Sequence, residues 1–134
     1  MFDVNFVESD SLLVGRVRGV LDGAAARKLV EFVELTEAER EKGFNRFCDL
    51  TQLEGINLSA DEIASFAGRR RAYNPNPIRV KSAFLISGPL ALGTVYMFKA
   101  LMQSERIEVR WFDSVEAAAA WLQVSPGILR QRSL

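Results

Sequence analysis

The first segment of the chain alternates apolar and polar positions with the period of two that is typical of β-strands. Phe2, Val4 and Phe6 predict a half-buried strand, and residues 12–20 predict a second strand. Residues 9–10 between them form a turn that is too short for a crossover. The two strands should therefore form an antiparallel hairpin.

After the hairpin the pattern changes to helical spacing. Apolar residues recur every three or four positions from Ala26, with Asp22 placed to cap the helix and Gly43 to end it. Thr36 and Glu39 have the spacing of a capping box, so this helix is predicted to bend or restart there. The later elements follow by the same criteria. They are a strand over 44–50, a loop over 51–58, a helix from Ser59 to the Asn-Pro-Asn-Pro stop at 74–77, a strand over 79–86, a helix over 89–103, a strand over 107–112 and a helix over 113–122.

The element order ββαβαβαβα predicts one α/β domain. Strands joined by crossover helices should lie parallel, whereas the first strand is antiparallel because of its hairpin. We therefore expect a five-stranded, mostly parallel mixed sheet packed by four helices. The domain should span residues 1–123, followed by a basic tail of low order over 124–134.

The composition excludes most catalytic and metal chemistry. The chain has 134 residues, with 17 basic and 17 acidic side chains, no histidine and one cysteine, Cys48. Without histidine it lacks the commonest general base and metal ligand, and one cysteine supports neither an internal disulfide nor a cysteine metal site. Zero net charge gives no general attraction to nucleic acid. We predict a binding protein that is no enzyme and needs no cofactor or metal, with Cys48 buried in its strand.

Residues 82–98 form the longest uncharged stretch of the chain. Gly88-Pro89 interrupts it, so it predicts a buried strand and a helix rather than a membrane span. The N-terminal residues lack the basic segment and long apolar run of a secretion signal. The expected location is cytoplasmic, with peripheral association at a membrane as the alternative.

Three stretches carry a family resemblance in combination. Residues 19–29 contain Gly-Val-Leu-Asp followed by Ala26 and Leu29, residues 49–60 read DLTQLEGINLSA, and residues 112–122 begin FDSVEA and end in Trp-Leu. The first is similar to the signature G-x-L-D-x-x-x-A-x-x-L of STAS domains, the bacterial anti-sigma factor antagonists of the SpoIIAA type. The second resembles that family's D-L-S-x-V-x-x-I-D-S-S-G segment, and the third its Sec14-related branch. The resemblance covers residues 1–123.

This resemblance implies a non-enzymatic interaction module with a protein partner. In sigma-regulating members the partner is an anti-sigma-type kinase, which phosphorylates the second Ser of D-S-S-G and thereby breaks the complex. Ser59 matches that position, while Asn57, Leu58 and Ala60 stand where the family has Asp, Ser and Gly. A phosphate on Ser59 would face free N–H groups at a helix N-terminus. The alternative role of Ser59 is that of a helix cap alone.

Four polar residues accompany Ser59 as candidates for partner binding in the loops: Asp22, Asp49, Thr51 and Asn57. Asp49 comes at the predicted end of a parallel strand, where α/β folds place their sites. The sequence leaves open whether Asp22 and Asp49 approach each other, as an acid–base pair would require.

The densest basic cluster is a candidate for binding an anion or a lipid headgroup. Its members are Arg69, Arg70, Arg71, Arg79 and Lys81. Basic residues near an anionic membrane surface each contribute about 1 kcal/mol of attraction. The alternative is a solvated helix C-terminus, where the helix dipole favours cations.

The third predicted helix is more apolar than one buried stripe requires. Ala91, Val95, Phe98 and Met102 fall on one stripe, and other apolar residues spread beyond it. Three explanations stay open: burial by neighbouring elements, a homodimer interface, or the wall of an apolar pocket that opens to a lipid or membrane. The residues that we single out for the last role are Leu90, Leu92, Tyr96, Met97 and Phe98.

Overall fold

The computed structural model describes residues 2–40, 42–73, 78–104 and 106–130. A five-stranded sheet in the order β1-β2-β3-β4-β5 forms its centre. β1 pairs antiparallel with β2, and all other neighbouring strands pair in parallel, so the predicted mixed sheet is confirmed. The strands are β1 (Phe2–Val7), β2 (Leu12–Asp22), β3 (Asn45–Asn57), β4 (Val80–Leu85) and β5 (Ile107–Phe112).

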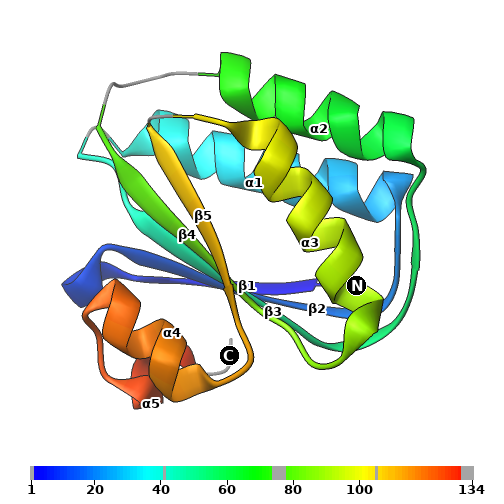
Figure 1. Ribbon diagram of the computed structural model, residues 1–134. Helices are drawn as coiled ribbons and strands as arrows, with labels where there is room; N and C mark the ends of the chain where they lie inside the picture. The colour runs from blue at the N-terminus through cyan, green and yellow to red at the C-terminus, as the bar shows by residue number, and fades with distance from the viewer. Residues whose placement is uncertain (1, 41, 74–77, 105, 131–134) are drawn as a thin grey trace.

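Helices cover both faces of the sheet (Figure 1). The three crossover helices α1 (Gly23–Glu39), α2 (Ala60–Ala72) and α3 (Pro89–Met102) lie on one face. Strands β2 to β5 are added in one direction, so right-handed crossovers place all three helices on the same side. The helices α4 (Val115–Leu122) and α5 (Pro126–Leu129) follow the last strand and cover the other face, and a 3₁₀ turn, η1 (Glu8–Asp10), joins β1 to β2.

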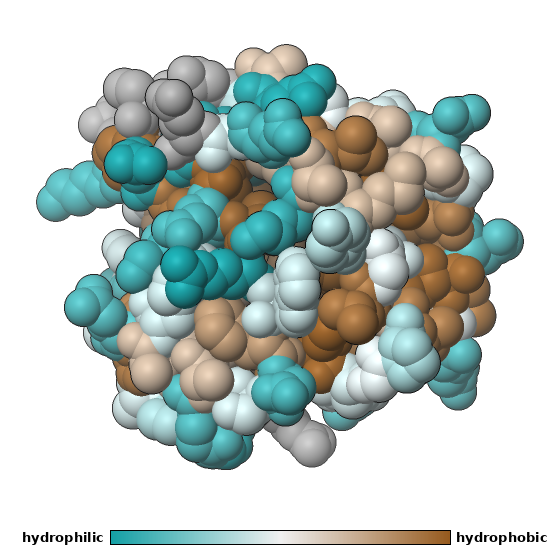
Figure 2. Space-filling model, viewed as in Figure 1, coloured by the Kyte–Doolittle hydropathy of each residue, from teal (hydrophilic) through white to brown (hydrophobic). Residues whose placement is uncertain are grey.

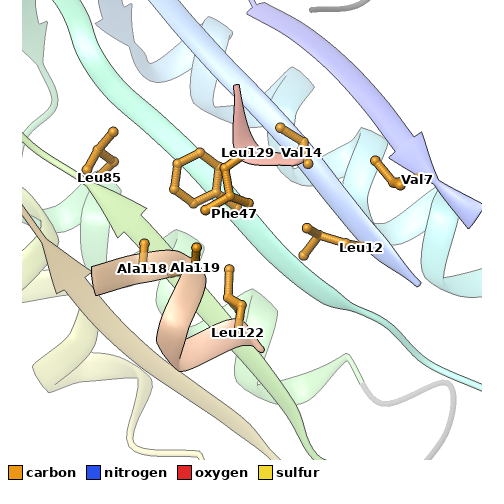
Figure 3. Close-up of a cluster of buried hydrophobic side chains, with 10 residues drawn as sticks. Val7, Leu12, Val14, Phe47, Leu85, Ala118, Ala119, Leu122 and Leu129 are labelled. Carbon is orange, nitrogen blue, oxygen red and sulfur yellow. The ribbon is translucent and has the colours of Figure 1, made fainter. Parts of the chain in front are cut away.

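Alternation along the strands gives the sheet two apolar faces. On the α4 side, Leu12 and Val14 of β2, Phe47 of β3 and Leu85 of β4 pack with Leu122 (Figure 3). On the α1–α3 side, Val17, Leu50 and Ile86 pack against the small or branched residues Ala26, Ala91 and Val95 of the helices. Successive side chains of a strand point to opposite faces, which is why the two cores share the same strands.

The segment predicted as a loop over 51–58 is a strand as far as Asn57, so that prediction is wrong. β3 pairs with β4 only as far as Asp49, but it continues beside β2 as far as the pair Asp22 and Asn57. We call this extension, residues 18–22 with 52–57, the β2–β3 ribbon. Its Gln, Glu, Gly and Asn residues have low strand propensity, and pairing with β2 overrides that preference. Gly19 has a φ of +75° beside a register shift, a conformation that glycine adopts at low cost.

Helix α1 runs without a break to Glu39, so the bend predicted at Thr36 is wrong. Thr36 is buried, and its hydroxyl donates to the Phe32 carbonyl at 2.9 Å, a bond within the helix. The helix ends at Arg40, before Gly43, whose φ of +71° reverses the chain toward β3. The predicted Asp22 cap is confirmed, because its carboxylate accepts from the Ala25 N–H at 2.8 Å.

The segment after residue 123 is packed where low order was predicted. It forms α5, and Leu129 is 2% exposed against Val14 and Phe47 (Figure 3). Arg16 of β2 donates to the Leu129 carbonyl at 2.6 Å. α4 ends at Leu122, after which Gln123 takes a left-handed φ of +61°. Pro126 then begins α5, which Pro at a first helical position favours. The stop predicted at 74–77 and the last four residues lie outside the described residues.

Candidate functional site

Ser59 is exposed at the N-terminus of α2 and holds a capping box, as the sequence predicted. Its hydroxyl accepts from the Glu62 N–H at 3.1 Å, and the Glu62 carboxylate accepts from the Ser59 N–H at 3.0 Å. Both bonds satisfy N–H groups that a helix start leaves without partners. The Ser59 hydroxyl thus lies at the surface and at the positive end of a helix dipole.

The N-termini of α1 and α2 meet beside Ser59. Gly23 opens α1, and a Cβ atom on it would lie only 2.2 Å from Oε2 of Glu62. The Glu62 carboxylate therefore lies against the start of α1 while capping α2, and it interacts favourably with both helix dipoles. Asp22 and Asn57 are opposite each other at the tip of the β2–β3 ribbon. Three predicted site residues, Asp22, Asn57 and Ser59, are therefore brought to one edge of the molecule.

Asp49 and Thr51 lie elsewhere. One oxygen of Asp49 accepts from the backbone N–H of Thr51 at 2.8 Å and from its hydroxyl at 2.6 Å. Asp49 is opposite Arg16, whereas Asp22 lies six residues further along β2, about 20 Å away at ~3.3 Å per residue. Asp22 and Asp49 therefore do not form an acid–base pair.

The predicted basic cluster is not one surface patch. Arg69 binds the Glu34 carboxylate through two nitrogens, at 2.6 and 3.1 Å, and Arg71 donates to the Leu101 carbonyl at 2.8 Å. Arg70 is 5% exposed. Lys81 donates to the Trp121 carbonyl at 2.8 Å on the opposite face of the sheet, and Arg79 is exposed just before β4.

Arg70 belongs to a buried ion network that the sequence pattern did not predict. Its two terminal nitrogens donate to Glu37 at 2.8 and 2.7 Å, and Arg46 of β3 donates to the same carboxylate at 3.0 Å. Burial raises the pKa of Glu37, but the bond from Arg70 and the charges of Arg46 and Arg70 outweigh it and hold that pKa below 4.5. Glu37 follows Val33 by four residues and so lies on the inward-facing stripe of α1. A carboxylate on an inward-facing stripe indicates a buried cation that pairs with it, and this was the signal in the sequence that could have predicted the network.

The predicted buried stripe of α3 is confirmed, and the helix also exposes apolar side chains. Ala91, Val95 and Met102 are buried. Leu90 and Leu92 are exposed near its start, Met97 is half-buried, and Tyr96 is 61% exposed with its ring 5.8 Å from Trp111. Figure 2 shows apolar surface where α3 begins and where the β2–β3 ribbon ends.

A cavity of about 180 Å³ lies between the sheet and the three crossover helices. We call it the α/β cavity. Its lining includes Leu13, Cys48 and Phe84 from the strands and Val33, Phe66 and Phe98 from the helices. Of the five apolar candidates on α3, Phe98 lines the cavity and the exposed Leu90, Leu92 and Tyr96 do not.

Cys48 faces the α/β cavity as a neutral thiol. Burial, with a smaller contribution from the charge of Asp49, raises the pKa of its thiol to about 12. The thiolate is the nucleophilic form, so Cys48 is unreactive at neutral pH. Among the described residues no group of three His, Cys, Asp or Glu side chains could hold a metal ion. No helix in that part of the chain is long and apolar enough to cross a membrane.

The fold is that of a known structural class. The chain is similar to a crystal structure of an uncharacterized protein from the DUF3478 family with a SpoIIAA-like fold, from Shewanella loihica PV-4. The TM-score is 0.59 at 15% sequence identity, over 91% of this chain and 92% of the other. No family model and no curated protein matches the sequence. The chain therefore has the SpoIIAA-like fold of STAS domains, which confirms the fold that the motifs predicted.

Proposed function

We propose that the chain is a non-enzymatic protein-interaction module whose partner binds at the tip of the β2–β3 ribbon, around Ser59. The observation that carries this proposal is the exposed Ser59 hydroxyl at the N-terminus of α2 in a SpoIIAA-like fold. Val20 of the ribbon is 51% exposed, and Leu90 of α3 is exposed at the same end of the sheet. An apolar surface beside polar, hydrogen-bonding groups suits a protein partner.

Phosphorylation of Ser59 would give this surface a switch. A phosphate adds a charge of about −2, which the N–H groups of the helix start favour. The same phosphate would displace the capping hydroxyl and repel the carboxylates of Asp61 and Glu62 next to it. The changed charge and the changed helix start would both weaken a complex formed around Ser59.

A matched pair of variants tests the charge at Ser59. Asparagine and aspartate cap helices about as well as serine, so Ser59→Asn keeps the cap without charge and Ser59→Asp adds the charge. In pull-downs from extracts of the source organism, we expect the wild type and Ser59→Asn to capture the same protein, and Ser59→Asp to lose most of it. Intact-mass analysis of the captured complex and of the free protein should find phosphate only on the free form.

Two outcomes would contradict this proposal. One is equal capture by all three proteins, because the charge at residue 59 would then not matter. The other is loss with both substitutions, which would assign the effect to the helix start rather than to charge. Ser59→Ala is the stability control, expected to lower the free energy of unfolding by about 1 kcal/mol through the lost cap.

A second candidate function is the binding of a small apolar molecule in the α/β cavity. Its volume of about 180 Å³ exceeds the ~150 Å³ of an engineered cavity that binds benzene. Its lining is almost wholly apolar, as in most small-molecule sites. Arg69 and Arg70 are bound to carboxylates, so this proposal assigns the ligand to the cavity rather than to an arginine patch.

Native mass spectrometry of the protein purified from its source organism tests this second function. We expect a bound species of low mass that leaves on denaturation, because an apolar cavity is more stable filled than empty. A preparation that carries no such species, and whose melting temperature no apolar compound raises, would remove this function.

A further inference from the structure

Aromatic side chains from four different elements line the α/β cavity. Three come from the helices that cover one face of the sheet, and the fourth comes from β4 (Figure 1). They are Phe32 of α1, Phe66 of α2, Phe98 of α3 and Phe84 of β4. The rings of Phe84 and Phe98 pack edge to face, with their centroids 6.1 Å apart and their planes at 76°. An aromatic ligand would gain similar ring contacts from this wall, which stabilise beyond the area that they bury.

Ser82 adds a hydroxyl group to the same wall. It lies two residues before Phe84 on β4, so both side chains point to the α1–α3 side of the sheet, about 7 Å apart along the strand. Ser82 is only 7% exposed and lines the cavity. Among the described residues its hydroxyl makes no hydrogen bond, although most buried polar side chains make at least one. The Ser82 hydroxyl therefore has an open hydrogen-bonding position toward the cavity.

The rest of the lining favours a ligand without charge. It is almost wholly apolar, and an ion would lose its hydration there without gaining a partner. Arg46 and Arg70 reach the lining, but both are paired with the Glu37 carboxylate. The Cys48 thiol is neutral too, because burial raises its pKa to about 12. A neutral molecule is therefore the ligand that this cavity accepts at the lowest cost.

We propose that the α/β cavity binds a small neutral aromatic molecule with one polar group, whose ring packs among the four phenylalanines and whose polar group hydrogen-bonds to Ser82. This proposal rests on the second candidate function and names its ligand class. A serine hydroxyl can donate or accept, so the hydroxyl of a phenol matches it in either sense. The volume of about 180 Å³ suits one substituted ring, because an engineered cavity of ~150 Å³ binds benzene.

Calorimetric titration of the wild-type protein with three probes of similar size tests the ligand class. p-Cresol has the aromatic ring and the hydroxyl, p-xylene has a methyl group in place of the hydroxyl, and 4-methylcyclohexanol has the hydroxyl on a saturated ring. We expect p-cresol to bind about five-fold more tightly than 4-methylcyclohexanol, because ring contacts add to the burial of apolar surface. This comparison needs no variant, so it decides the question of the ring even if a substitution prevents folding.

Ser82→Ala separates the hydrogen bond from the ring contacts, because it removes the hydroxyl and leaves the four phenylalanines in place. The variant should bind p-cresol about five-fold more weakly than the wild type does, the usual effect of one net hydrogen bond. It should bind p-xylene at least as tightly as the wild type, because p-xylene has no group to pair with the hydroxyl. Thr94→Val is the matched control. Thr94 of α3 also lines the cavity, and exchanging its hydroxyl for a methyl group should leave p-cresol binding unchanged.

Gly15→Val tests whether the cavity is the binding site. Gly15 of β2 lines the cavity, and a Cβ on it meets only ordinary contacts, at 3.8 Å from the Asp3 carbonyl oxygen and 3.9 Å from that of Phe47. The valine side chain should therefore fit the fold, fill part of the cavity and abolish the binding of all three probes. Gly93→Ala is the control. Its Cβ meets nothing within 4 Å on exposed helix surface, so all affinities should stay unchanged.

The outcomes distinguish the ligand class from the cavity function. Equal affinities of the wild type for p-cresol and 4-methylcyclohexanol would overturn the aromatic class and leave an apolar cavity site. Unchanged p-cresol binding by Ser82→Ala, or weaker binding by Thr94→Val, would overturn the role of Ser82. If no probe binds at millimolar concentration, this proposal and the second candidate function both fail. Binding of p-cresol that survives Gly15→Val would assign the ligand to another surface and also overturn the proposal.

Discussion

Replacing Glu37 by glutamine is expected to lower the free energy of unfolding by about 3–5 kcal/mol, the usual effect of removing one partner from a buried ion pair. Glutamine has almost the same shape as glutamate, so the loss of stability measures the effect of removing the charge. Arg70 and Arg46 both donate to the Glu37 carboxylate, and without it their buried guanidinium groups would repel each other. Urea unfolding followed by circular dichroism measures the change.

The pH dependence of this variant gives an independent check. The pKa of Glu37 is held below 4.5 in the folded protein, so its contribution to stability is complete above about pH 4.5 and is lost as the pH falls through the folded pKa. The stability difference between the wild type and Glu37→Gln should therefore shrink in acid. Glu8→Gln is the control. Glu8 pairs with Arg40 at the surface, so this substitution should change the free energy of unfolding by no more than about 0.5 kcal/mol. Equal losses in the two variants would contradict the network.

The second large effect is expected at the C-terminal end of the domain. Leu129→Ala should lower the free energy of unfolding by about 2–5 kcal/mol, because it leaves a cavity in the core against Val14 and Phe47. This substitution tests whether α5 belongs to the folded domain. The sequence predicted that the domain ends at residue 123 and that the later residues form a tail. Thermal unfolding and urea unfolding should give the same loss in the free energy of unfolding.

A neighbouring substitution serves as the control for this experiment. Ser125 precedes α5, is exposed and makes no side-chain cap, so Ser125→Ala should change stability by within about 0.5 kcal/mol. If Leu129→Ala has the same free energy of unfolding as the wild type, α5 does not pack against the sheet in solution. The core would then end with α4, as the sequence predicted.

Local patterns were enough to predict most of the fold. The hairpin of β1 and β2, the caps at Asp22 and Ser59 and the buried stripe of α3 all depend on residues close together in the chain. The order of strands and helices then determined the parallel sheet, because crossovers are right-handed. The three motif stretches, including the one that ends around Ser59, predicted the SpoIIAA-like fold correctly.

The errors occurred where a distant partner decides the local structure. β3 extends to Asn57 because β2 lies beside it, although its own residues favour a loop. α5 forms where its Leu129 meets Phe47, far away in the sequence. Short segments with weak propensity take their structure from such contacts.

The sequence by itself determined which side of each element is apolar, and hence the layers of the fold and the exposure of Ser59 at a helix start. Only the tertiary structure decided which charges meet. Arg70 pairs with Glu37, 33 residues away in the sequence, and is therefore buried rather than part of a basic surface cluster. It alone also placed Arg46 in the wall of an apolar cavity. The physical reason is that periodicity records the environment of a residue, whereas ion pairs and cavities depend on how separate elements fit together.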